Sequence, residues 1–191
     1  MSTKTLALLA LASTSILATP FPLAQSDVPS FGDKIGIEAT GTNIAKVDLR
    51  AKQGQIFVGG SQDAVCDGGQ TQDVATFVLY SDGTLFLYKL SNPPQQLWVD
   101  NGGNGGGVTG YTSGSEPLSK SASRSKFALD GDGNLTFEGT GAKACPTKDA
   151  DTYTVWFTSS AKPGNQDGCV DIKLKAYKAP ARVACEYSHS P

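Results

Sequence analysis

The sequence predicts an all-β protein, an antiparallel sandwich or barrel of about 8–11 short strands with two disulfides and no significant helix. Short apolar or alternating runs are separated by clusters of glycine, aspartate, asparagine and proline, which is typical of strands joined by turns. No long run has the period of an amphipathic helix. Because no crossover helices separate the runs, neighbouring strands are expected to pair antiparallel.

The N-terminus has the pattern of a signal peptide, predicted over residues 1–18. Lys4 supplies the positive start, and the 13 residues from Leu6 to Ala18 form an apolar run. A membrane span needs about 20 apolar residues, so this run is too short to cross a bilayer. A buried N-terminal helix is the alternative, which the flanking charge disfavours. Cleavage is expected after Ala18, with Ala24 as the second possibility.

Beyond the signal, residues 19–30 are interpreted as an extended spacer and residues 31–191 as a single β domain, a normal size for one core. The spacing of apolar runs and turn residues defines the expected strands in this domain. They cover residues 34–38, 45–49, 55–58, 76–80, 84–90, 96–99, 127–129, 135–138, 152–158, 169–177 and 182–187.

Turn chemistry predicts two hairpins. Asp82 and Gly83 lie between the strands 76–80 and 84–88, and both are expected to adopt the positive φ of a tight turn. The second hairpin joins 127–129 to 135–137 through the polar residues 130–134. Further along, residues 170–177 alternate strictly between apolar and polar, so one face of that strand is expected to be buried and the other solvated.

The four cysteines are an even number in an exported chain, which predicts two structural disulfides. Three pairings are possible, and the sequence leaves all three open. Zinc is the rival interpretation, but the nearest two cysteines are 16 residues apart and the chain has a single histidine, so no metal or other cofactor is expected. The cysteines are Cys66, Cys145, Cys169 and Cys185.

The charge of the chain limits its partners. The formal charge is -2 and becomes about -3 once Lys4 leaves with the signal peptide, so no basic field attracts nucleic acid or anionic lipid. The C-terminal letters EYSHSP include no apolar tail for a glycolipid anchor. We therefore expect no nucleic-acid partner and no membrane anchor.

A glycine-rich run at residues 102–110 has the GxGxxG spacing of a dinucleotide-binding loop, at Gly105, Gly107 and Gly110. No helix follows it, so a mobile surface loop is predicted. The adjacent Tyr111 is predicted to be an exposed aromatic that contacts carbohydrate, together with Gly105 and Gly107.

In contrast to Tyr111, the two tryptophans are expected to be buried. Trp98 and Trp156 each lie in an apolar strand, so both are expected in the core.

Catalytic side chains are scarce. His189 is expected to be a solvated tail residue and not the base of a nucleophilic triad. A glycosidase needs two facing carboxylates, and the chain has only four glutamates, so we predict that the protein is not an enzyme.

The acidic residues of the second hairpin resemble the start of an EF-hand calcium loop, but the pattern fails. Leu135 stands where that loop needs glycine, and Gly141 stands where it needs glutamate. The same segment contains one N-glycosylation sequon, Asn134-Leu135-Thr136. Asn134 is therefore a predicted glycosylation site at an exposed hairpin end.

Several motifs carry a family resemblance from about Gln55 to Tyr187, and all four cysteines fall in matching places. The motifs are AVCD (64–67), TFVLYSDGTLFLY (76–88), QQLWVD (95–100), GYTSG (110–114), FALD (127–130), LTFEG (135–139), ACP (144–146), VWF (155–157), GC (168–169) and ACEY (184–187). With these motifs the chain resembles the fungal cell wall protein PhiA family, secreted wall proteins that include a mould allergen. The resemblance implies a secreted, wall-associated protein needed for phialide and conidium formation, with no known catalytic residues.

Three functional hypotheses follow. The leading one is a non-enzymatic wall protein held among polysaccharides by weak contacts. The second is a soluble carbohydrate-binding module that uses Tyr111 and the glycine-rich run. The third is a small hydrolase acting on the wall, which requires a cleft with two close carboxylates.

Overall fold

The computed structural model describes residues 28–103 and 106–189. The predicted signal peptide, residues 1–18, lies outside the described residues, as does most of the predicted spacer. The last residues of the spacer are described, and Pro29 is buried there against the domain. Ordered structure therefore includes Val28–Ser30, just before the expected start of the domain at residue 31.

The described residues are almost entirely strands and turns, with two short 3-10 helices, η1 (Asp67–Gly69) and η2 (Pro163–Asn165). Within this part of the chain, no helix has the length and hydropathy of a membrane-spanning segment. The strands are β1 (Lys34–Gly41), β2 (Ile44–Lys52), β3 (Gln55–Gly59), β4 (Ala64–Cys66), β5 (Phe77–Leu79), β6 (Leu85–Leu87), β7 (Gln95–Asp100), β8 (Val108–Ser113), β9 (Ala122–Ser123), β10 (Phe127–Leu129), β11 (Leu135–Phe137), β12 (Ala142–Pro146), β13 (Thr152–Phe157), β14 (Val170–Lys178) and β15 (Cys185–Tyr187).

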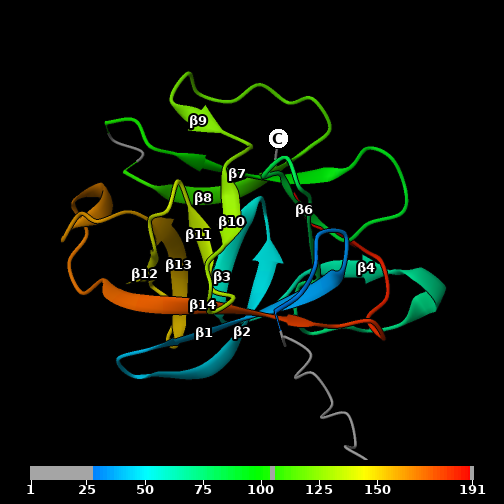
Figure 1. The fold of residues 1–191 in the computed structure, drawn as a ribbon. Helices are drawn as coiled ribbons and strands as arrows, with labels where there is room; N and C mark the ends of the chain where they lie inside the picture. Colours follow the sequence, from blue (N-terminus) through cyan, green and yellow to red (C-terminus); the bar gives the residue numbers. More distant parts are fainter. Residues whose placement is uncertain (1–27, 104–105, 190–191) are drawn as a thin grey trace, which may run out of the picture.

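Eleven of these strands form one antiparallel sheet that closes into a barrel, in the order β14-β12-β13-β8-β3-β2-β1-β5-β6-β7-β9. β14 pairs with β12 on one side and with β1 on the other, so the sheet closes on itself, while β9, the last strand of the order, pairs with β7. Figure 1 shows β1 and β14 along the lower part of the barrel and β7 and β8 along the upper part. The observed fold is thus the barrel of the two predicted architectures, and closure removes most exposed sheet edges.

The core follows from the alternation of side chains along each strand. On β14, Ile172, Leu174 and Ala176 are buried while Asp171 and Lys173 between them are exposed, as the period of two predicted. A separate two-stranded sheet, β10–β11, adds its aromatic residues to this core.

The two aromatic rings of β10–β11 meet a third ring, from β13, in the core. The rings of Phe127 and Phe137 lie 5.0 Å apart edge to face, and Phe127 lies 5.9 Å from Phe157 of β13. All three side chains are buried, so the β10–β11 hairpin is fixed to the barrel by its aromatic face.

Each predicted run contains an observed strand, but four strands were missed: β4, β8, β9 and β12. β12 is a central strand, paired with both β13 and β14, although Ala142–Pro146 has no β-branched or aromatic residue. β8 begins inside the glycine-rich run, which was interpreted as a loop. Tertiary pairing outweighs weak local propensity in both places.

Both predicted hairpins are present, with one correction to the first turn. Gly83 has a φ of +79°, but Asp82 is not among the residues with positive φ. Instead, one oxygen of the Asp82 carboxylate accepts hydrogen bonds from the backbone N (3.0 Å) and the hydroxyl (2.6 Å) of Thr84. The loop is therefore a three-residue turn with a single left-handed glycine, and aspartate acts through its side chain.

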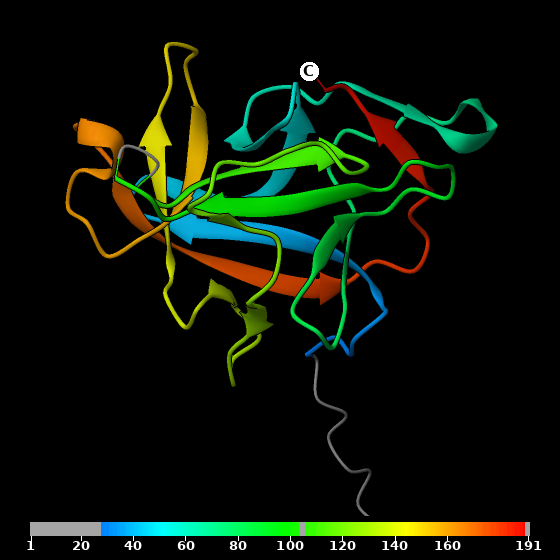
Figure 2. The same cartoon turned by 90° about the horizontal axis from the view of Figure 1, so that it is seen from above.

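The disulfide pairing left open by the sequence is Cys66–Cys185 and Cys145–Cys169. Cys66 and Cys185 lie directly opposite each other in the β4–β15 pair. The second bridge joins the end of β12 to the residue before β14. Figures 1 and 2 show β4 and β15 together on one side of the barrel, with β12 and β13 on the other.

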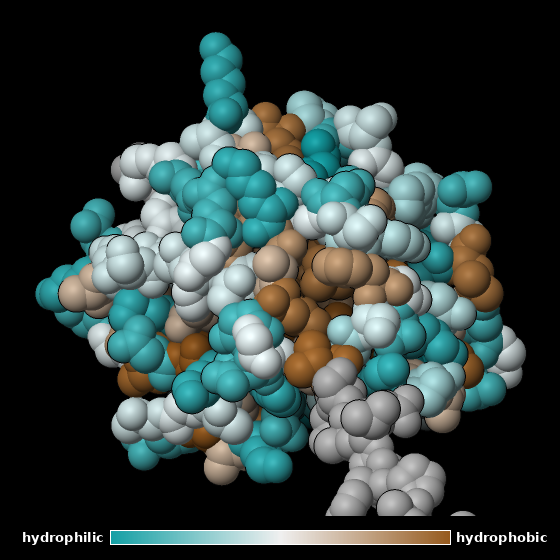
Figure 3. All heavy atoms as spheres, in the orientation of Figure 1, coloured by the Kyte–Doolittle hydropathy of each residue, from teal (hydrophilic) through white to brown (hydrophobic). Residues whose placement is uncertain are grey.

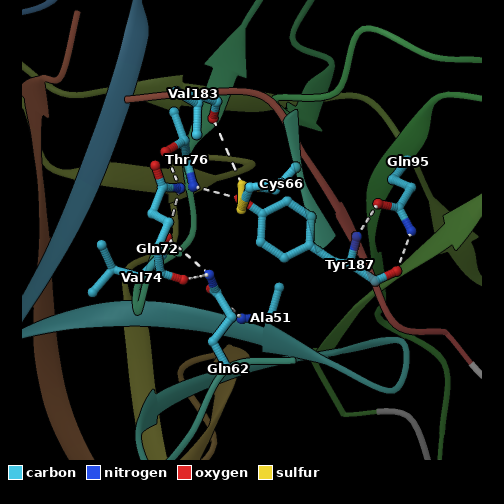
Figure 4. Close-up of a disulfide and its surroundings, with 10 residues drawn as sticks. Ala51, Gln62, Cys66, Gln72, Val74, Thr76, Gln95, Val183 and Tyr187 are labelled. Atoms are coloured by element: carbon cyan, nitrogen blue, oxygen red, sulfur yellow. Dashed lines mark hydrogen bonds between the residues drawn. A yellow bond between two sulfur atoms is a disulfide. The ribbon is translucent and has the colours of Figure 1, made fainter. Parts of the chain in front are cut away.

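The first bridge lies in a network of buried amide groups, shown in Figure 4. The side chain of Gln95 holds Tyr187 by two bonds: Gln95 Nε2 donates to the carbonyl (2.7 Å), and Gln95 Oε1 accepts from the backbone N (2.9 Å). The Tyr187 hydroxyl accepts from the backbone N of Thr76 at 3.0 Å. Gln62 Nε2 in turn donates to the carbonyl of Val74. The C-terminal strand is thus joined to β7 and to the segment that leads into β5.

Replacing both cysteines of a disulfide by alanine is expected to lower the free energy of unfolding, and the loss should differ between the two disulfides. The two bridges span 119 and 24 residues, and loop-closure entropy makes the longer one worth about 1.4 kcal/mol more. Urea unfolding of the Cys66→Ala/Cys185→Ala and Cys145→Ala/Cys169→Ala variants measures the difference. A larger loss from the shorter bridge would contradict this expectation.

Candidate functional site

Tyr111 is not the exposed aromatic that the sequence suggested. Its side chain is 2% exposed and lies on the inner face of β8, opposite Leu97 of β7. The hydroxyl donates to the carbonyl of Ser188, and burial raises the pKa of the Tyr111 phenol. The expected exposure was wrong because residue 111 belongs to a strand whose alternation directs it inward. Tyr111 nevertheless lies among the residues that line the second hollow described below.

Gly107 also has a structural role and not the predicted place in a mobile surface loop. It is buried with a φ of +102°, and a Cβ there would overlap the carbonyl of Phe157. The Gly107 carbonyl accepts a hydrogen bond from the backbone N of Phe157 at 2.8 Å. Only glycine allows this close approach of two backbones. Gly105 lies outside the described residues.

Several aromatic side chains line a groove of about 700 Å³ on the outer face of the β5–β6 hairpin, here called the aromatic groove. Tyr80 is 46% exposed and meets Phe86 edge to face, with 5.6 Å between ring centroids. Leu90, at 71% exposed, extends the apolar surface. The residues that define the groove are Lys34, Tyr80, Phe86, Tyr88, Leu90 and Gln96.

Strand register explains why these side chains share one face. Lys34 of β1 stands opposite Val78, Val78 stands opposite Phe86, and Phe86 stands opposite Gln96 of β7. Residues directly opposite each other in a sheet point to the same side. The groove floor is therefore a row across four strands, β1-β5-β6-β7.

Polar groups surround the aromatic rings of the groove. The Lys34 ammonium lies 5.2 Å from the centre of the Tyr88 ring and donates to the carbonyl of Arg182 at 2.9 Å. Gln96 and Asp82 also line the groove. Aromatic faces bordered by amide, carboxylate and ammonium groups suit a ligand with both apolar and hydroxyl-bearing surfaces.

Sequence reasoning missed this surface although a signal was present. Residues 84–88 alternate, with Leu85 and Leu87 buried and Phe86 and Tyr88 turned the other way. An aromatic residue at the outward position of an amphipathic strand was the signal that could have identified the groove.

A second hollow, of about 390 Å³, lies on the outer face of β7 and β8 and is here called the Trp98 cleft. Trp98 lies opposite Gly110 in the sheet, and a Cβ at Gly110 would stand 2.6 Å from Cζ2 of the indole. Trp98 is only partly buried, whereas Trp156 is 6% exposed in the core as predicted. The residues that define the cleft are Gln55, Trp98, Asp100, Thr112, Glu116 and His189.

His189 is not the solvated tail residue that the sequence predicted. Its side chain is 19% exposed, and its Nε2 lies 2.6 Å from Glu116 Oε1. The preceding Ser188 carbonyl accepts hydrogen bonds from Tyr111 and from the backbone N of Gly54, which holds the last described residues at the cleft.

Every glutamate of the chain lies beside a basic side chain. The four glutamate carboxylates thus lie apart from one another on the surface, and each one is close to a basic side chain of the protein. Among residues 28–103 and 106–189, no three side chains of His, Cys, Asp or Glu gather as a metal ion would require. The pairs are Glu38–Lys46 at 3.9 Å, Glu116–His189 at 2.6 Å, Glu138–Lys126, and Glu186–Lys89 at 3.0 Å.

Asn134 lies where the second hairpin turn ends, and it is half-buried. Its Nδ2 donates to the Asp130 carboxylate at 3.0 Å, and its backbone N donates to the same group at 2.8 Å. These bonds, with the Asn134 side chain first, lower the pKa of the Asp130 carboxyl. The segment with the calcium-loop resemblance is therefore a hairpin turn capped by Asp130.

Figure 3 shows that apolar side chains also gather at the centre of the face seen in Figure 1, beside the first described residues. A hollow of about 350 Å³ beside the first described residues is lined by Val28, Phe31 and Leu129. Phe31 is 64% exposed there, so this area is a separate apolar surface from the aromatic groove.

Comparisons with known proteins give a consistent result. The family model of the PhiA-like secreted proteins matches residues 35–188. The cell wall protein phiA of Aspergillus niger is 36% identical over 151 residues, 78% of this chain and 81% of that protein. Its namesake in Emericella nidulans is 33% identical over 183 residues, 93% of this chain and 98% of that protein. The cell wall protein phiA of Arthroderma benhamiae is 34% identical over 190 residues, 95% of this chain and 99% of that protein. No solved structure is significantly similar to this chain.

The match begins at residue 35, so it includes β1 and β2, before the expected start at Gln55. It ends beyond Tyr187 and contains all four cysteines. A family match over most of the chain, with several relatives above 30% identity, shows that this chain belongs to the PhiA-like secreted protein family and is a secreted fungal cell wall protein.

Proposed function

We propose that this wall protein acts by adhesion and not by catalysis, and that weak non-covalent contacts with wall polysaccharide hold it in place. The aromatic groove is the observation that carries the proposal. Pyranose rings have apolar C–H faces and hydroxyl edges, and the groove combines Tyr80, Phe86 and Tyr88 with the polar groups of Lys34 and Gln96.

The arrangement of carboxylates supports a non-enzymatic role. A wall hydrolase needs one carboxylate to protonate the leaving group and a second to attack or to activate water. Each glutamate here lies beside a lysine or the histidine. The groove itself contains a single carboxylate, Asp82, which accepts two hydrogen bonds from Thr84.

The alternative of a soluble carbohydrate-binding module uses the same groove and differs in where the protein stays. A protein retained by the wall is released from isolated walls by salt or detergent, whereas a soluble module is recovered from the culture fluid. Sequential extraction of walls therefore separates the two proposals.

Removing two aromatic rings from the groove is expected to weaken binding to insoluble polysaccharide. The Tyr80→Ala/Tyr88→Ala variant loses the stacking surface, and we expect its retention on chitin or β-1,3-glucan to fall about tenfold, equivalent to about 1.4 kcal/mol. Pull-down of the mature protein, with bound and free fractions quantified, measures this.

Phe31→Ala is the matched control for this experiment. Phe31 is an exposed aromatic residue at 64%, but it lies outside the groove, so its loss should leave binding unchanged. Equal urea midpoints for the variants verify that folding is intact. If the double tyrosine variant binds as well as the unaltered protein, adhesion through the groove is wrong.

We further propose a role in asexual development, which the resemblance to PhiA proteins implies. Deleting the gene in the producing fungus is expected to reduce the number of conidia. Reintroducing the Tyr80→Ala/Tyr88→Ala variant should then restore fewer conidia than the unaltered gene, because the wall retains less of the protein. Normal conidiation in the deletion strain would remove the developmental role.

Glycosylation at Asn134 is the third part of the proposal. Removal of N-glycans from the secreted protein should lower its mass, and Thr136→Val should abolish this shift because the sequon is lost. Thr136→Ser is the control, since serine retains the sequon and the hydroxyl that donates to the Ala128 carbonyl. A protein whose mass does not change on enzymatic deglycosylation carries no N-glycan there.

A further inference from the structure

Trp98, which lines the Trp98 cleft, carries a polar atom that the fold leaves without a partner. Trp98 Nε1 is buried, and among the described residues nothing accepts its hydrogen bond. The other tryptophan differs, because Trp156 Nε1 donates to the Thr154 hydroxyl at 2.8 Å. A buried donor without an acceptor costs about 1–3 kcal/mol, so it needs a reason.

Packing alone accounts for the ring of Trp98 but not for its nitrogen. The indole covers the strand at Gly110, where the absent Cβ makes room for it. Phenylalanine would cover a glycine in the same way without bringing a buried N–H group. The indole nitrogen is therefore the part of this side chain that the barrel does not use.

Trp98 lines a hollow with the properties of a small-molecule site. The volume of about 390 Å³ lies within the range of ligand pockets, roughly 300–1,000 Å³. Carboxylate, hydroxyl, amide and imidazole groups line it, from Asp100, Thr112, Gln55 and His189. An aromatic ring with several hydrogen-bonding groups on different strands suits a compact ligand with many hydroxyls.

The charges of the cleft favour an uncharged ligand. Asp100 accepts bonds from Ser119 (2.7 Å), Ser121 (2.6 Å) and the backbone N of Gly102 (2.9 Å), which lower the pKa of its carboxyl. An anionic sugar would be repelled by this carboxylate. The Asp100 oxygens already accept hydrogen bonds within the protein, and Glu116 Oε1 lies 2.6 Å from His189 Nε2, so a cationic amino sugar would have to compete with these contacts.

We propose that the Trp98 cleft is a second binding site, which holds an uncharged sugar residue through a hydrogen bond from Trp98 Nε1 and stacking on the indole. The inference extends the proposed adhesion to a site separate from the aromatic groove. The groove would engage the surface of an insoluble polymer, whereas the cleft would take a short soluble saccharide or a chain end.

The indole N–H signals of the mature protein test this directly, because the chain has two tryptophans. Nuclear magnetic resonance titration with laminarihexaose and with N-acetylchitohexaose should move the Trp98 indole signal and leave that of Trp156 in place. Trp98→Phe identifies the signal and should weaken binding about fivefold to tenfold, the effect of one hydrogen bond. Trp156→Phe is the matched control and should not change the affinity.

The other outcomes would overturn the inference. If neither hexaose moves the Trp98 signal at millimolar concentration, the cleft is not a saccharide site. If oligogalacturonate or a glucosamine oligomer moves it as strongly as the uncharged sugars do, the charge argument is wrong. The Tyr80→Ala/Tyr88→Ala variant should keep the response of Trp98, so failure at the cleft and failure at the aromatic groove are distinguishable.

Discussion

The pairing of β1 with β14 is the constraint on which the rest of the structure depends. Seven residue pairs join Ile35–Gly41 to Ile172–Lys178, segments from opposite ends of the domain, and this ladder closes the sheet. Closure gives each strand of the barrel a defined inner face and a defined outer face, because side chains alternate across a sheet with a period of two. The Cys66–Cys185 bridge and the Gln95–Tyr187 bonds add a second link between early and late parts of the chain. Few contacts of a barrel are local, so such cross-links matter for its stability.

Glycine and aromatic residues face each other at two places in the barrel, and the pairs connect fold and surface. Gly36 lies opposite Tyr177, and a Cβ at Gly36 would overlap the Tyr177 ring. The Tyr177 hydroxyl is hydrogen-bonded to both Asp48 and Arg182. Burial, followed by the hydrogen bond to Asp48, raises the pKa of the Tyr177 phenol to about 12. The pair of Gly110 and Trp98 has the same arrangement but leaves the indole nitrogen unpartnered in the described structure. Tyr177 therefore serves only packing and internal hydrogen bonds, whereas Trp98 faces a cleft.

The outer face of β7 connects the two candidate surfaces of this wall protein. Gln96 lines the aromatic groove, while Trp98 and Asp100, two and four residues further on, line the Trp98 cleft. The inward residues of the same strand, Leu97 and Val99, are buried in the core. One strand thus supplies both sites, and the rigid barrel fixes their relative positions. Adhesion of this kind needs a stable surface and several weak contacts, and it does not require activated side chains.

The sequence by itself determined the all-β class, the places of most strands, the two hairpins and membership of a secreted wall protein family. These features depend on local alternation, turn residues and cysteine positions, which are visible along the chain. Only the tertiary structure decided that the sheet is a barrel, how the cysteines pair, and that Tyr111 faces inward while Tyr80 and Phe86 line a groove. Burial of Tyr111 depends on a strand that starts within glycines, and the groove depends on register among β1, β5, β6 and β7. Barrel closure and the register of β1 with β5 arise from contacts between residues far apart in the chain, and local sequence patterns do not specify them.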